Sequence, residues 1–408
     1  MAASAYRTAH DLPPRYTRRV IDVVLHPGRD RSLRRRHPWV LSGAVARVVG
    51  EPAPGAFARV LAAEGEVLGF GHYSPQSALR VRMLAFEKDL AEEGLLEARI
   101  ADAVARRVAS PLLRDTDAVR LVNAEGDGLP GLVADRYGDV LVVKLTSAGM
   151  LVRRELLAAA LREATGAAVG FERADSVAAR KEGLPARQGP LWGEPPVTPL
   201  WICERGRRYR VDLAEGQKTG FYLDQRDARD LVERLAAGRR VLDLFCYTGG
   251  FGVAAARGGA QYLTLVESSG PALALAQENL TANAAVAPVR FAQADAFEFL
   301  RSDDSVYDLL ILDPPPMARA ERDVARAARA YKDLLRSALR QSAPRAVLLV
   351  FACSHHMGPE KLRQIVFGAS LEAGRPLRVL ATLGAAPDHA VALDHPEGAY
   401  LSGLLLEA

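Results

Sequence analysis

The chain has 408 residues, of which 49% are hydrophobic and 25% are charged, and its formal net charge is +4. This length exceeds what one hydrophobic core usually serves, so we expect two or three domains. The longest apolar run, residues 346–353, is far too short to cross a bilayer, which excludes a membrane-spanning protein and favours a soluble, cytoplasmic one.

The N-terminus and the cysteines narrow the class further. Residues 1–19 lack the apolar core of a secretion signal and are predicted to be a leader outside any domain. Cys203, Cys246 and Cys353 have neither close pairing nor metal-ligand spacing. We therefore predict a reducing environment, no disulfide framework and no metal site, and one of the three could be a reactive thiol.

Arginine is concentrated in the first fifty residues, where ten arginines face three aspartates. Such a cluster is what a polyanion would meet first, and His37, Trp39 and Tyr73 lie near it in sequence and could stack on bases. The alternative is a solvated surface in a protein that prefers arginine to lysine. We favour nucleic acid and predict that the contacts involve Arg34, Arg35, Arg36 and Trp39. The cluster as a whole consists of Arg7, Arg15, Arg18, Arg19, Arg29, Arg31, Arg34, Arg35, Arg36 and Arg47.

In chain order, residues 20–88 form the first predicted domain. Short strand-like runs at 20–25, 56–61, 67–71 and 79–84 alternate with Gly and Pro turns, which is typical of a small β-barrel. Residues 89–198 follow as a small α+β module. Here we expect helices over 90–108 and 151–164, strands at 118–122 and 140–145, and a turn-rich linker at 189–196.

Residues 199–408 alternate strands and helices, which predicts a parallel α/β sheet with right-handed crossovers. The expected strands are 240–245, 262–267, 289–292, 307–312 and 346–351, followed by a closing pair at 377–383 and 400–406. The expected helices are 252–257, 270–283, 296–301, 323–342 and 359–373. Ligands of such sheets bind beyond the carboxyl ends of the strands.

A glycine-rich turn, Thr248-Gly-Gly-Phe-Gly252, follows the first of these strands, and Glu267 ends the second. Glycines let a backbone approach a ligand closely, and an acid at the end of the next strand can accept hydrogen bonds from ribose hydroxyls. The turn has neither the Gly-x-Gly-x-x-Gly spacing nor a phosphate-binding Lys-Ser/Thr. The pattern therefore indicates an adenosine without a pyrophosphate, such as S-adenosylmethionine.

Further acids and a cysteine fall at the same predicted sheet edge. Asp295 ends the third strand, where its carboxylate can accept from an adenine amino group and also cap the next helix. Asp313 precedes three prolines, which force the chain out of the sheet as a stiff loop that could hold the carboxylate against a base. Asp243 and Cys353 complete the group.

With these motifs the chain resembles the cytosine-5 methyltransferases of 23S ribosomal RNA that have a PUA domain, a central α/β module and a class I S-adenosylmethionine-dependent domain. The resemblance spans nearly the whole chain and implies a Rossmann-like, seven-stranded α/β sheet whose last strand is antiparallel. A homodimer is also considered. The motifs that carry the resemblance are residues 32–44, 125–131, 216–226, 245–251, 313–315, 331–333, 352–354 and 394–400.

The resemblance assigns roles to individual residues. Cys353 is implied to be the nucleophile, whose thiolate adds to carbon 6 of cytosine, while Asp313 contacts ring nitrogen 3 and the amino group. A thiol pKa lowered by His355, Lys332 or the helix after Pro359 is expected. The implied cofactor-binding residues are Lys218, Thr219, Gly220, Tyr222, Asp243, Tyr247, Thr248, Gly249, Glu267 and Asp295.

Several points stay open on the sequence. Cys246 lies inside the glycine turn, where we expect packing only, and a cysteine at a strand end is often merely a small hydrophobic residue. The family usually has another residue at Pro316 and often lacks the His355-His356 pair, so the base that releases product is open. The alternatives to a carbon methyltransferase are an enzyme that methylates an exocyclic amino group without a cysteine, and a non-catalytic RNA-binding assembly factor.

Overall fold

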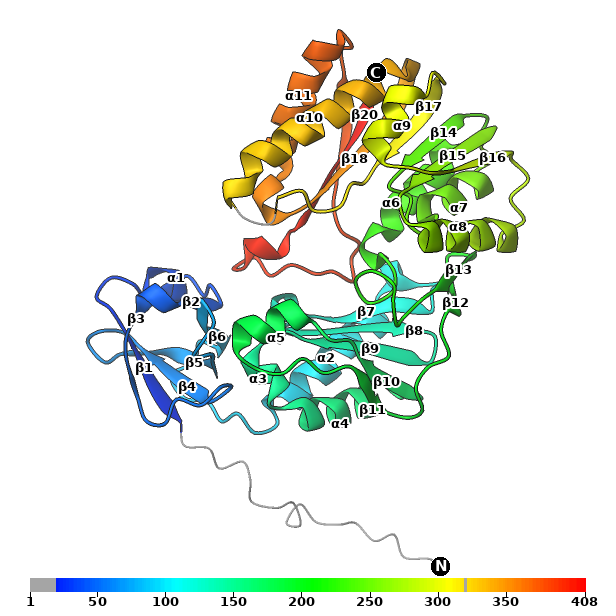
Figure 1. The fold of residues 1–408 in the computed structure, drawn as a ribbon. Helices are drawn as coiled ribbons and strands as arrows, with labels where there is room; N and C mark the ends of the chain where they lie inside the picture. Colours follow the sequence, from blue (N-terminus) through cyan, green and yellow to red (C-terminus); the bar gives the residue numbers. More distant parts are fainter. Residues whose placement is uncertain (1–19, 319–320) are drawn as a thin grey trace, which may run out of the picture. The chain divides into compact units, whose positions relative to one another are not determined.

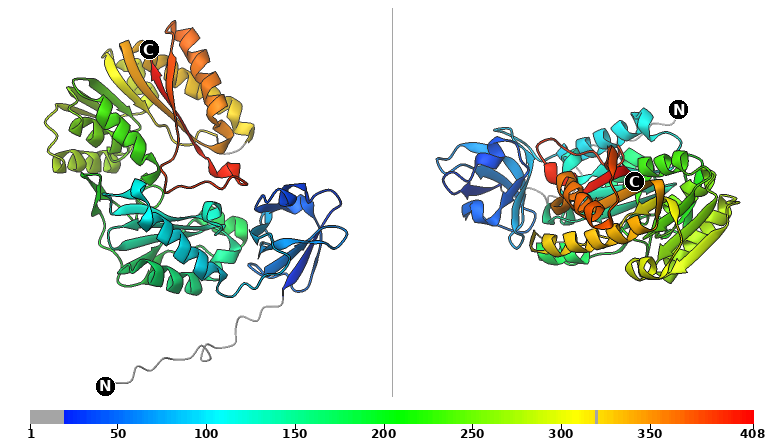
Figure 2. Two further views of the ribbon diagram at one scale, coloured as in Figure 1. Left: turned by 180° about the vertical axis from the view of Figure 1, so that it is seen from behind. Right: turned by 90° about the horizontal axis from the view of Figure 1, so that it is seen from above.

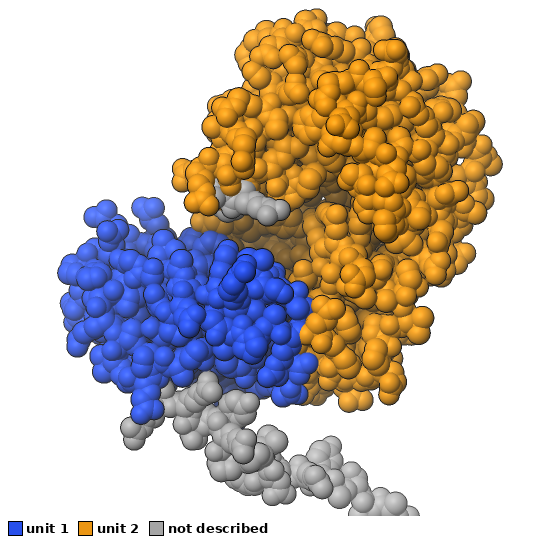
Figure 3. Space-filling model, viewed as in Figure 1, with its two compact units in different colours: residues 1–98, 145–157, 174–187 blue, residues 99–144, 158–173, 188–408 orange. Residues whose placement is uncertain are grey.

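The computed structural model describes residues 20–318 and 321–408, apart from the side chain of His355. The predicted leader, with Arg7, Arg15, Arg18 and Arg19, lies outside the described residues. The chain divides into two compact units, coloured separately in Figure 3. One unit comprises residues up to 98, 145–157 and 174–187, and the other comprises residues 99–144, 158–173 and 188–408. No helix in the described residues combines the length and apolarity that a membrane span requires.

The N-terminal unit contains a six-stranded sheet in the order β2-β6-β5-β4-β1-β3. Its core consists of alternate, inward-facing residues such as Ile21, Val23 and Leu25. All four predicted strands are present, but two others escaped prediction because they are short or largely exposed. The strands are β1 (Ile21–Leu25), β2 (Trp39–Leu41), β3 (Val45–Val49), β4 (Phe57–Leu61), β5 (Val67–Tyr73) and β6 (Leu79–Ala85), and the short helix α1 (Arg31–Arg34) precedes β2.

The second unit includes most of helix α2 (Leu95–Ala109) and contains a five-stranded sheet in the order β11-β10-β9-β8-β7. The strands are β7 (Ala118–Asn123), β8 (Leu132–Tyr137), β9 (Val140–Leu145), β10 (Val169–Glu172) and β11 (Gly189–Trp192). The predicted helix over 151–164 is interrupted, with α3 (Ala148–Leu151) and α4 (Arg154–Thr165) on either side of the break. α3 and α5 (Ser176–Glu182), which follows β10, belong to the N-terminal unit.

The prediction of a linker at 189–196 is wrong at its first half, because Gly189–Trp192 is the strand β11. Trp192 packs directly on Gly170, where an added Cβ would lie 2.4 Å from the indole ring. The indole nitrogen of Trp192 also donates to the Ala167 carbonyl at 3.0 Å. Burial of this side chain holds a Gly- and Pro-rich segment in the sheet, which turn composition alone does not reveal.

Residues 200–408 of the same unit build a seven-stranded sheet in the order β16-β15-β14-β17-β18-β20-β19. The first five of these strands are parallel, and β20 is antiparallel to both of its neighbours, as predicted. β14 lies between β15 and β17, so the strand order reverses there. The strands are β14 (Arg240–Leu244), β15 (Tyr262–Glu267), β16 (Val289–Gln293), β17 (Tyr307–Leu312), β18 (Ser342–Cys353), β19 (Arg378–Leu383) and β20 (Leu401–Glu407).

Helices cover both faces of this sheet (Figures 1 and 2). Successive residues of β14 alternate between the two cores, since Val241 packs in one cluster and Leu242 in the other. The first cluster includes residues of α6 (Arg226–Leu235), α7 (Gly250–Arg257) and α8 (Gly270–Ala282). The second includes residues of α9 (Ala296–Ser302), α10 (Val324–Arg340) and α11 (Pro359–Ala373).

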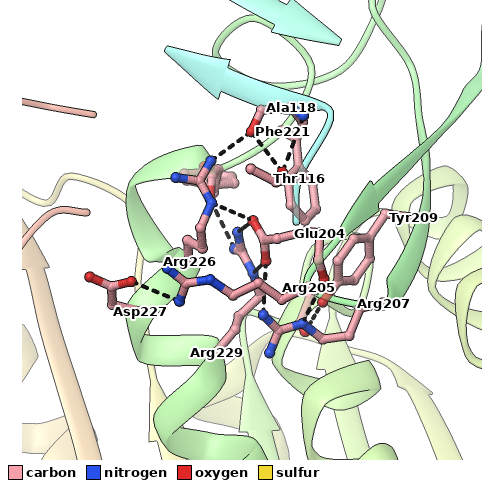
Figure 4. A network of polar contacts seen from close by, with 12 residues as sticks. Thr116, Ala118, Glu204, Arg205, Arg207, Tyr209, Phe221, Arg226, Asp227 and Arg229 are labelled. Carbon is pink, nitrogen blue, oxygen red and sulfur yellow. Dashed lines mark hydrogen bonds and ion pairs between the residues drawn. The ribbon is translucent and has the colours of Figure 1, made fainter. Parts of the chain in front are cut away.

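Sequence analysis did not predict the hairpin of β12 (Leu200–Glu204) and β13 (Arg207–Val211), nor the helix α6. A buried ion network joins them (Figure 4). Glu204 accepts from Arg229 at 2.8 and 2.7 Å and contacts Arg226 at 3.3 Å. Arg226 also donates to the Ala118 carbonyl of β7 at 2.6 Å. This network fixes the start of α6, and with it the residues that immediately precede the helix.

Candidate active site

A cavity of about 530 Å³ opens at the carboxyl edge of the seven-stranded sheet, where the strand order reverses. This size falls in the range of small-molecule sites. The cavity gathers residues from segments far apart in the chain. Its principal lining residues are Gln217, Lys218, Tyr222, Gln225, Phe245, Tyr247, Thr248, Glu267, Asp295, Phe297, Asp313, Pro314, Pro315, Pro316, Met317 and Cys353.

The glycine turn after β14 has an unusual backbone that places it against the cavity. Phe245 (φ 63°), Tyr247 (φ 50°) and Gly249 (φ 75°) are all in the left-handed region. At Gly249 an added Cβ would lie 3.0 Å from the Cβ of Ala276, so a side chain there would push the turn off α8. Oε2 of Glu267 accepts from the Tyr247 amide at 3.0 Å, and Oε1 accepts from the Ser269 amide at 2.9 Å. These bonds hold the Glu267 carboxylate at the cavity wall.

Asp295 caps the helix that follows it and also lines the cavity. Its Oδ1 accepts from the Phe297 and Glu298 amides at 2.9 and 3.1 Å, so it caps α9. Asp295 and the adjacent Phe297 both line the cavity. The cap leaves the second carboxylate oxygen of Asp295 available to a ligand.

Four of the predicted cofactor residues do not line the cavity: Thr219, Gly220, Asp243 and Gly249. The Thr219 hydroxyl is buried and bonds Asp135 at 2.5 Å and the Tyr137 hydroxyl at 2.8 Å. The Gly220 carbonyl accepts from the Tyr247 hydroxyl at 3.2 Å. Asp243 is buried, and burial, reinforced by Asp313, raises its pKa well above the usual value.

Cys353 and Asp313 meet at the ends of adjacent strands. β18 is longer than predicted, so Cys353 is its last residue and not part of the loop beyond it. Asp313 directly follows β17. The Cys353 thiol donates to Oδ1 of Asp313, with sulfur and oxygen 3.7 Å apart. Both side chains line the cavity beside Pro314, which follows from the stiff turn at the proline run.

The expectation of a lowered thiol pKa is wrong for this ligand-free state. Burial, and then the negative charge of Asp313, raise the pKa of Cys353 well above its usual value. Burial and Asp224 likewise raise the pKa of Asp313, to about 6. Lys332, one predicted source of positive charge, instead pairs with Glu372 at 2.6 Å. The cation that opposes the rise at Cys353 is Lys218.

Lys218 is held at the cavity by aromatic and acidic partners. Its backbone is left-handed, with φ 55°. Its ammonium group forms an ion pair with Asp224 and lies 4.3 Å from the Tyr222 ring centre and 5.4 Å from that of Tyr400. The Tyr400 hydroxyl donates to Asp224 at 2.6 Å. These contacts fix a positive charge on the side of the cavity that contains Cys353.

Gln225, which was not predicted from the sequence, ends the 3-10 turn Leu223–Gln225 and is the N-cap residue of α6. Its Nε2 donates to Oδ2 of Asp313 at 2.9 Å. Gln225 is 1% exposed, lines the cavity, and its Oε1 has no hydrogen-bond partner among the described residues. No periodicity marks this residue, since only the folded chain brings it to Asp313.

The remaining cysteine and aromatic predictions have mixed outcomes. Cys246 is buried in the core, and burial raises its pKa well above the usual value, but it also lines the cavity, so the expectation that it serves packing alone stays a prediction. Tyr73 was predicted to be free to stack on RNA, which is wrong. It is 7% exposed and belongs to the core of the six-stranded sheet.

The arginines of the N-terminal cluster differ in the side chains that they contact. Arg34 pairs with Asp30 at 2.5 Å and with Glu66 at 2.7 Å, so its charge is largely compensated. The Arg36 guanidinium lies 5.4 Å from the ring centre of Phe86. Arg35 is exposed, and Trp39 begins β2 with its ring 5.8 Å from that of His37. The described arginines of the cluster are all exposed, so these ion pairs reduce the charge of Arg34 and leave the basic surface in place.

The strand order, the glycine turn and the acids at the ends of β15 and β16 define a class I S-adenosylmethionine-dependent methyltransferase. A family model described as an S-adenosylmethionine-dependent methyltransferase matches residues 129–379, and one described as a PUA-like domain matches residues 23–86. The chain belongs to this methyltransferase family and carries a PUA-like domain at its N-terminal side.

Similar proteins cover nearly the full length. The chain is 41% identical over 390 residues to ribosomal RNA large subunit methyltransferase I of Shewanella amazonensis, which covers 94% of this chain and 98% of the relative. It is 39% identical over 393 residues to the protein of that name from Aeromonas salmonicida, covering 95% and 99%. In fold it is similar to an S-adenosylmethionine-dependent methyltransferase from Streptococcus mutans, with a TM-score of 0.81, 22% identity, and coverage of 95% and 100%.

The residues of the cavity fit S-adenosylmethionine. A cavity of about 530 Å³ offers the Glu267 carboxylate and the uncapped Asp295 oxygen as acceptors and Phe245 and Phe297 as apolar walls. The buried Thr248 hydroxyl, which lines the cavity, has no hydrogen-bond partner among the described residues. An adenosine supplies hydroxyl and amino donors for the carboxylates and a flat ring for the phenylalanines.

Proposed function

We propose that this enzyme methylates carbon 5 of a cytosine in the RNA of the large ribosomal subunit through a covalent adduct with Cys353. The observation that carries the proposal is the contact between the Cys353 thiol and Asp313 at 3.7 Å, inside the cavity that also holds Glu267 and Asp295. A nucleophile and a carboxylate are what addition to a pyrimidine ring requires. The relatives named as large subunit methyltransferases support the RNA class.

Carbon 5 of cytosine is a poor nucleophile, and addition of a thiolate to carbon 6 makes it enamine-like. Bound S-adenosylmethionine supplies an electrophilic methyl group on a sulfonium. Asp313 takes the proton of the Cys353 thiol as sulfur bonds to carbon 6. The addition shifts the π electrons of the ring toward nitrogen 3, and Asp313 passes a proton to that nitrogen. When the sulfur leaves, the proton on nitrogen 3 returns to Asp313.

The electrostatics of the pair suit this transfer. The resting thiol is neutral, because burial and Asp313 raise its pKa, and Asp313 has a pKa raised to about 6, so it can accept and return a proton near neutrality. Lys218 opposes the rise in the thiol pKa and stabilises the thiolate as it forms. The thiol therefore stays protonated until the target cytosine enters the cavity and Asp313 takes the thiol proton.

Loss of the hydrogen at carbon 5 requires a base. His356 does not line the cavity, and the side chain of His355 lies outside the described residues. The assignment of either histidine to this step stays a prediction.

We assign the predicted cofactor residues to two roles. Glu267 receives the ribose hydroxyls, Asp295 the adenine amino group, and Tyr247 and Thr248 form the turn beside them. Lys218 and Tyr222 lie between this end and Cys353. Thr219, Gly220 and Gly249 act behind the wall and hold the Lys218 segment and the turn in position, which the proximity of Asp135, Tyr247 and Ala276 supports. Asp243 is buried in β14 behind the same wall.

RNA binding is proposed for the PUA-like domain, with Arg35, Arg36 and Trp39 as contacts. Arg34 is the weakest of the four predicted residues, since Asp30 and Glu66 already pair with it. Action on ribosomal RNA would place the enzyme in the cytoplasm. A homodimer stays a prediction, and light scattering of the purified protein measures it.

Mapping of 5-methylcytosine in ribosomal RNA tests the proposal. RNA from a strain lacking this gene should lose the modification at one position, and the wild-type protein should restore it. Cys353→Ser should fail to restore it, while the matched Cys203→Ser variant, whose thiol does not line the cavity, should succeed. Retention of the mark in the deleted strain would contradict the proposal.

Methylation of an exocyclic amino group is the second candidate, and the resting protonation of Cys353 favours it, since that reaction needs no thiolate. Under this alternative Cys353→Ser would keep full activity and the product would be an N-methylated base. An assembly factor would bind S-adenosylmethionine without turnover on ribosomal RNA. Mass spectrometry of the digested RNA product separates the three.

A further inference from the structure

In the side-chain amide of Gln225, the nitrogen has a hydrogen-bond partner among the described residues and the oxygen has none. Its Nε2 donates to Oδ2 of Asp313 at 2.9 Å, whereas Oε1 is buried without a hydrogen-bond partner among the described residues. A buried acceptor without a donor is unfavourable, and native proteins seldom retain one. Because Gln225 lines the cavity and is 1% exposed, a ligand in the cavity is the available source of that donor.

Asp313 determines which end of the amide faces the ligand. An ionised carboxylate only accepts hydrogen bonds, so it holds the Nε2 end of Gln225 toward itself and turns Oε1 away. Reversal of the amide would set Oε1 against the carboxylate, two acceptors face to face. Asp313 itself is fixed by the stiff proline run that follows it. Two acceptors therefore lie side by side at the cavity wall, one from Asp313 and one from Gln225.

We propose that Gln225 reads the exocyclic amino group of the target cytosine and so discriminates cytosine from uracil. The inference rests on the proposed function, in which Asp313 contacts nitrogen 3. Cytosine protonated at nitrogen 3 presents two adjacent donors, the nitrogen 3 hydrogen and the amino group. These match the acceptors of Asp313 and Gln225. Uracil has an oxygen in place of the amino group. That oxygen would face Oε1 of Gln225, and since both atoms are acceptors no hydrogen bond could form.

The neighbouring polar groups do not fulfil this role. Gln217, the other amide of the cavity, already accepts from the Tyr222 hydroxyl. Asp224 also has an oxygen without a hydrogen-bond partner, but its other oxygen bonds Lys218 and Tyr400, and it does not line the cavity. Among these three, Gln225 alone combines an unused acceptor with a place on the cavity wall beside Asp313.

The test uses synthetic RNA fragments centred on the mapped position, with cytidine, uridine or the 2-pyrimidinone nucleoside there. The last lacks only the amino group. The wild-type enzyme should prefer cytidine to 2-pyrimidinone by about 10-fold to 100-fold in kcat/KM, as expected for loss of one buried hydrogen bond. In Gln225→Met this preference should shrink to within about threefold, because the acceptor is gone.

Gln217→Met is the matched control, since it removes the other cavity amide. It should keep the wild-type preference for cytidine whatever its absolute rate. Affinity for S-adenosylhomocysteine, measured by calorimetry, reports whether each variant retains a folded cofactor site. Gln225→Glu keeps an acceptor but sets a second carboxylate beside Asp313, so it should preserve the preference and shift the pH-rate profile to higher pH.

Two results overturn the inference separately from the proposed function. If Gln225→Met lowers the rates on cytidine and 2-pyrimidinone by the same factor, Gln225 only positions Asp313 and reads no amino group. If it leaves both rates unchanged, the amide does not meet the substrate. By contrast, wild-type enzyme that makes no 5-methylcytosine in any of these RNAs overturns the proposed function, and the inference with it.

Discussion

Cys353 and Asp313 face each other at 3.7 Å across the ends of the adjacent parallel strands β18 and β17. The contact keeps the thiol protonated at rest, because the carboxylate and the buried setting both disfavour a second negative charge. The nucleophile and its proton acceptor are therefore one coupled unit, so a change at either residue alters the protonation of the other.

Replacement of Asp313 by Asn should separate reactivity of the thiol from catalysis. Loss of the negative charge lowers the thiol pKa, so Cys353 should be alkylated by iodoacetamide faster than in wild type at pH 8. Catalysis should nevertheless fall by about 100-fold to 1,000-fold, since no carboxylate carries the proton to nitrogen 3. Peptide mass spectrometry follows each cysteine, and Cys203, in a different strand, should react at an unchanged rate. Slower alkylation of Cys353 would contradict the coupling.

The same substitution should stabilise the fold above neutral pH. Burial raises the pKa of Asp313 to about 6 from a usual value of 3.8, so the native state binds a proton more tightly than the unfolded chain and ionisation opposes folding as pH rises through 6. Asp313→Asn removes that term. Its free energy of unfolding in urea should exceed that of wild type by up to about 3 kcal/mol at pH 8. The gain should shrink toward pH 5, and a gain independent of pH would indicate another cause.

Lys218 should act on the thiol, in contrast to Lys332. Lys218→Met removes the charge that opposes the rise in the thiol pKa, so the pH-rate profile should move to higher pH and the rate at pH 7.5 should fall about 10-fold or more. Lys332→Met is the control, because Lys332 pairs with Glu372 and should leave the profile unchanged. An unshifted profile for Lys218→Met, with weakened S-adenosylhomocysteine binding, would assign Lys218 to the cofactor alone.

The Glu204 network should be essential for stability. Glu204→Gln leaves the buried Arg226 and Arg229 without their shared carboxylate, which should lower the free energy of unfolding by about 3–5 kcal/mol at pH 7.5. Burial alone would raise the pKa of Glu204, but Arg229, Arg226 and Arg207 hold it below the usual value. The stabilisation is therefore complete above the unfolded pKa and is lost as pH falls toward the folded one.

Glu372→Gln is the matched control for Glu204→Gln, because it breaks the exposed ion pair with Lys332. An exposed pair contributes little, so this variant should unfold at the same urea concentration as wild type. A small effect at Glu204, equal to that at Glu372, would mean that the buried arginines find other partners or water.

The order of the elements could be read from the sequence where apolar runs are strong. β15 and β17 and the helix α11 have the predicted bounds, since buried parallel strands and a helix with Pro at its first position give clear local signals. Helix α6 was missed because its segment is dominated by charge, and two of its arginines are buried only because Glu204 reaches them. β11 was missed because Trp192 decides its place through packing.

By itself the sequence determined the class of enzyme and the edge of the sheet at which it works, because glycine turns, strand ends and proline runs are local features. Only the tertiary structure decided how the site is charged. It placed Lys218 rather than Lys332 near Cys353, set Gln225 against Asp313, and withdrew Tyr73 into a core. The reason is that desolvation and Coulomb interactions depend on distances between residues far apart in the chain, which no local pattern encodes.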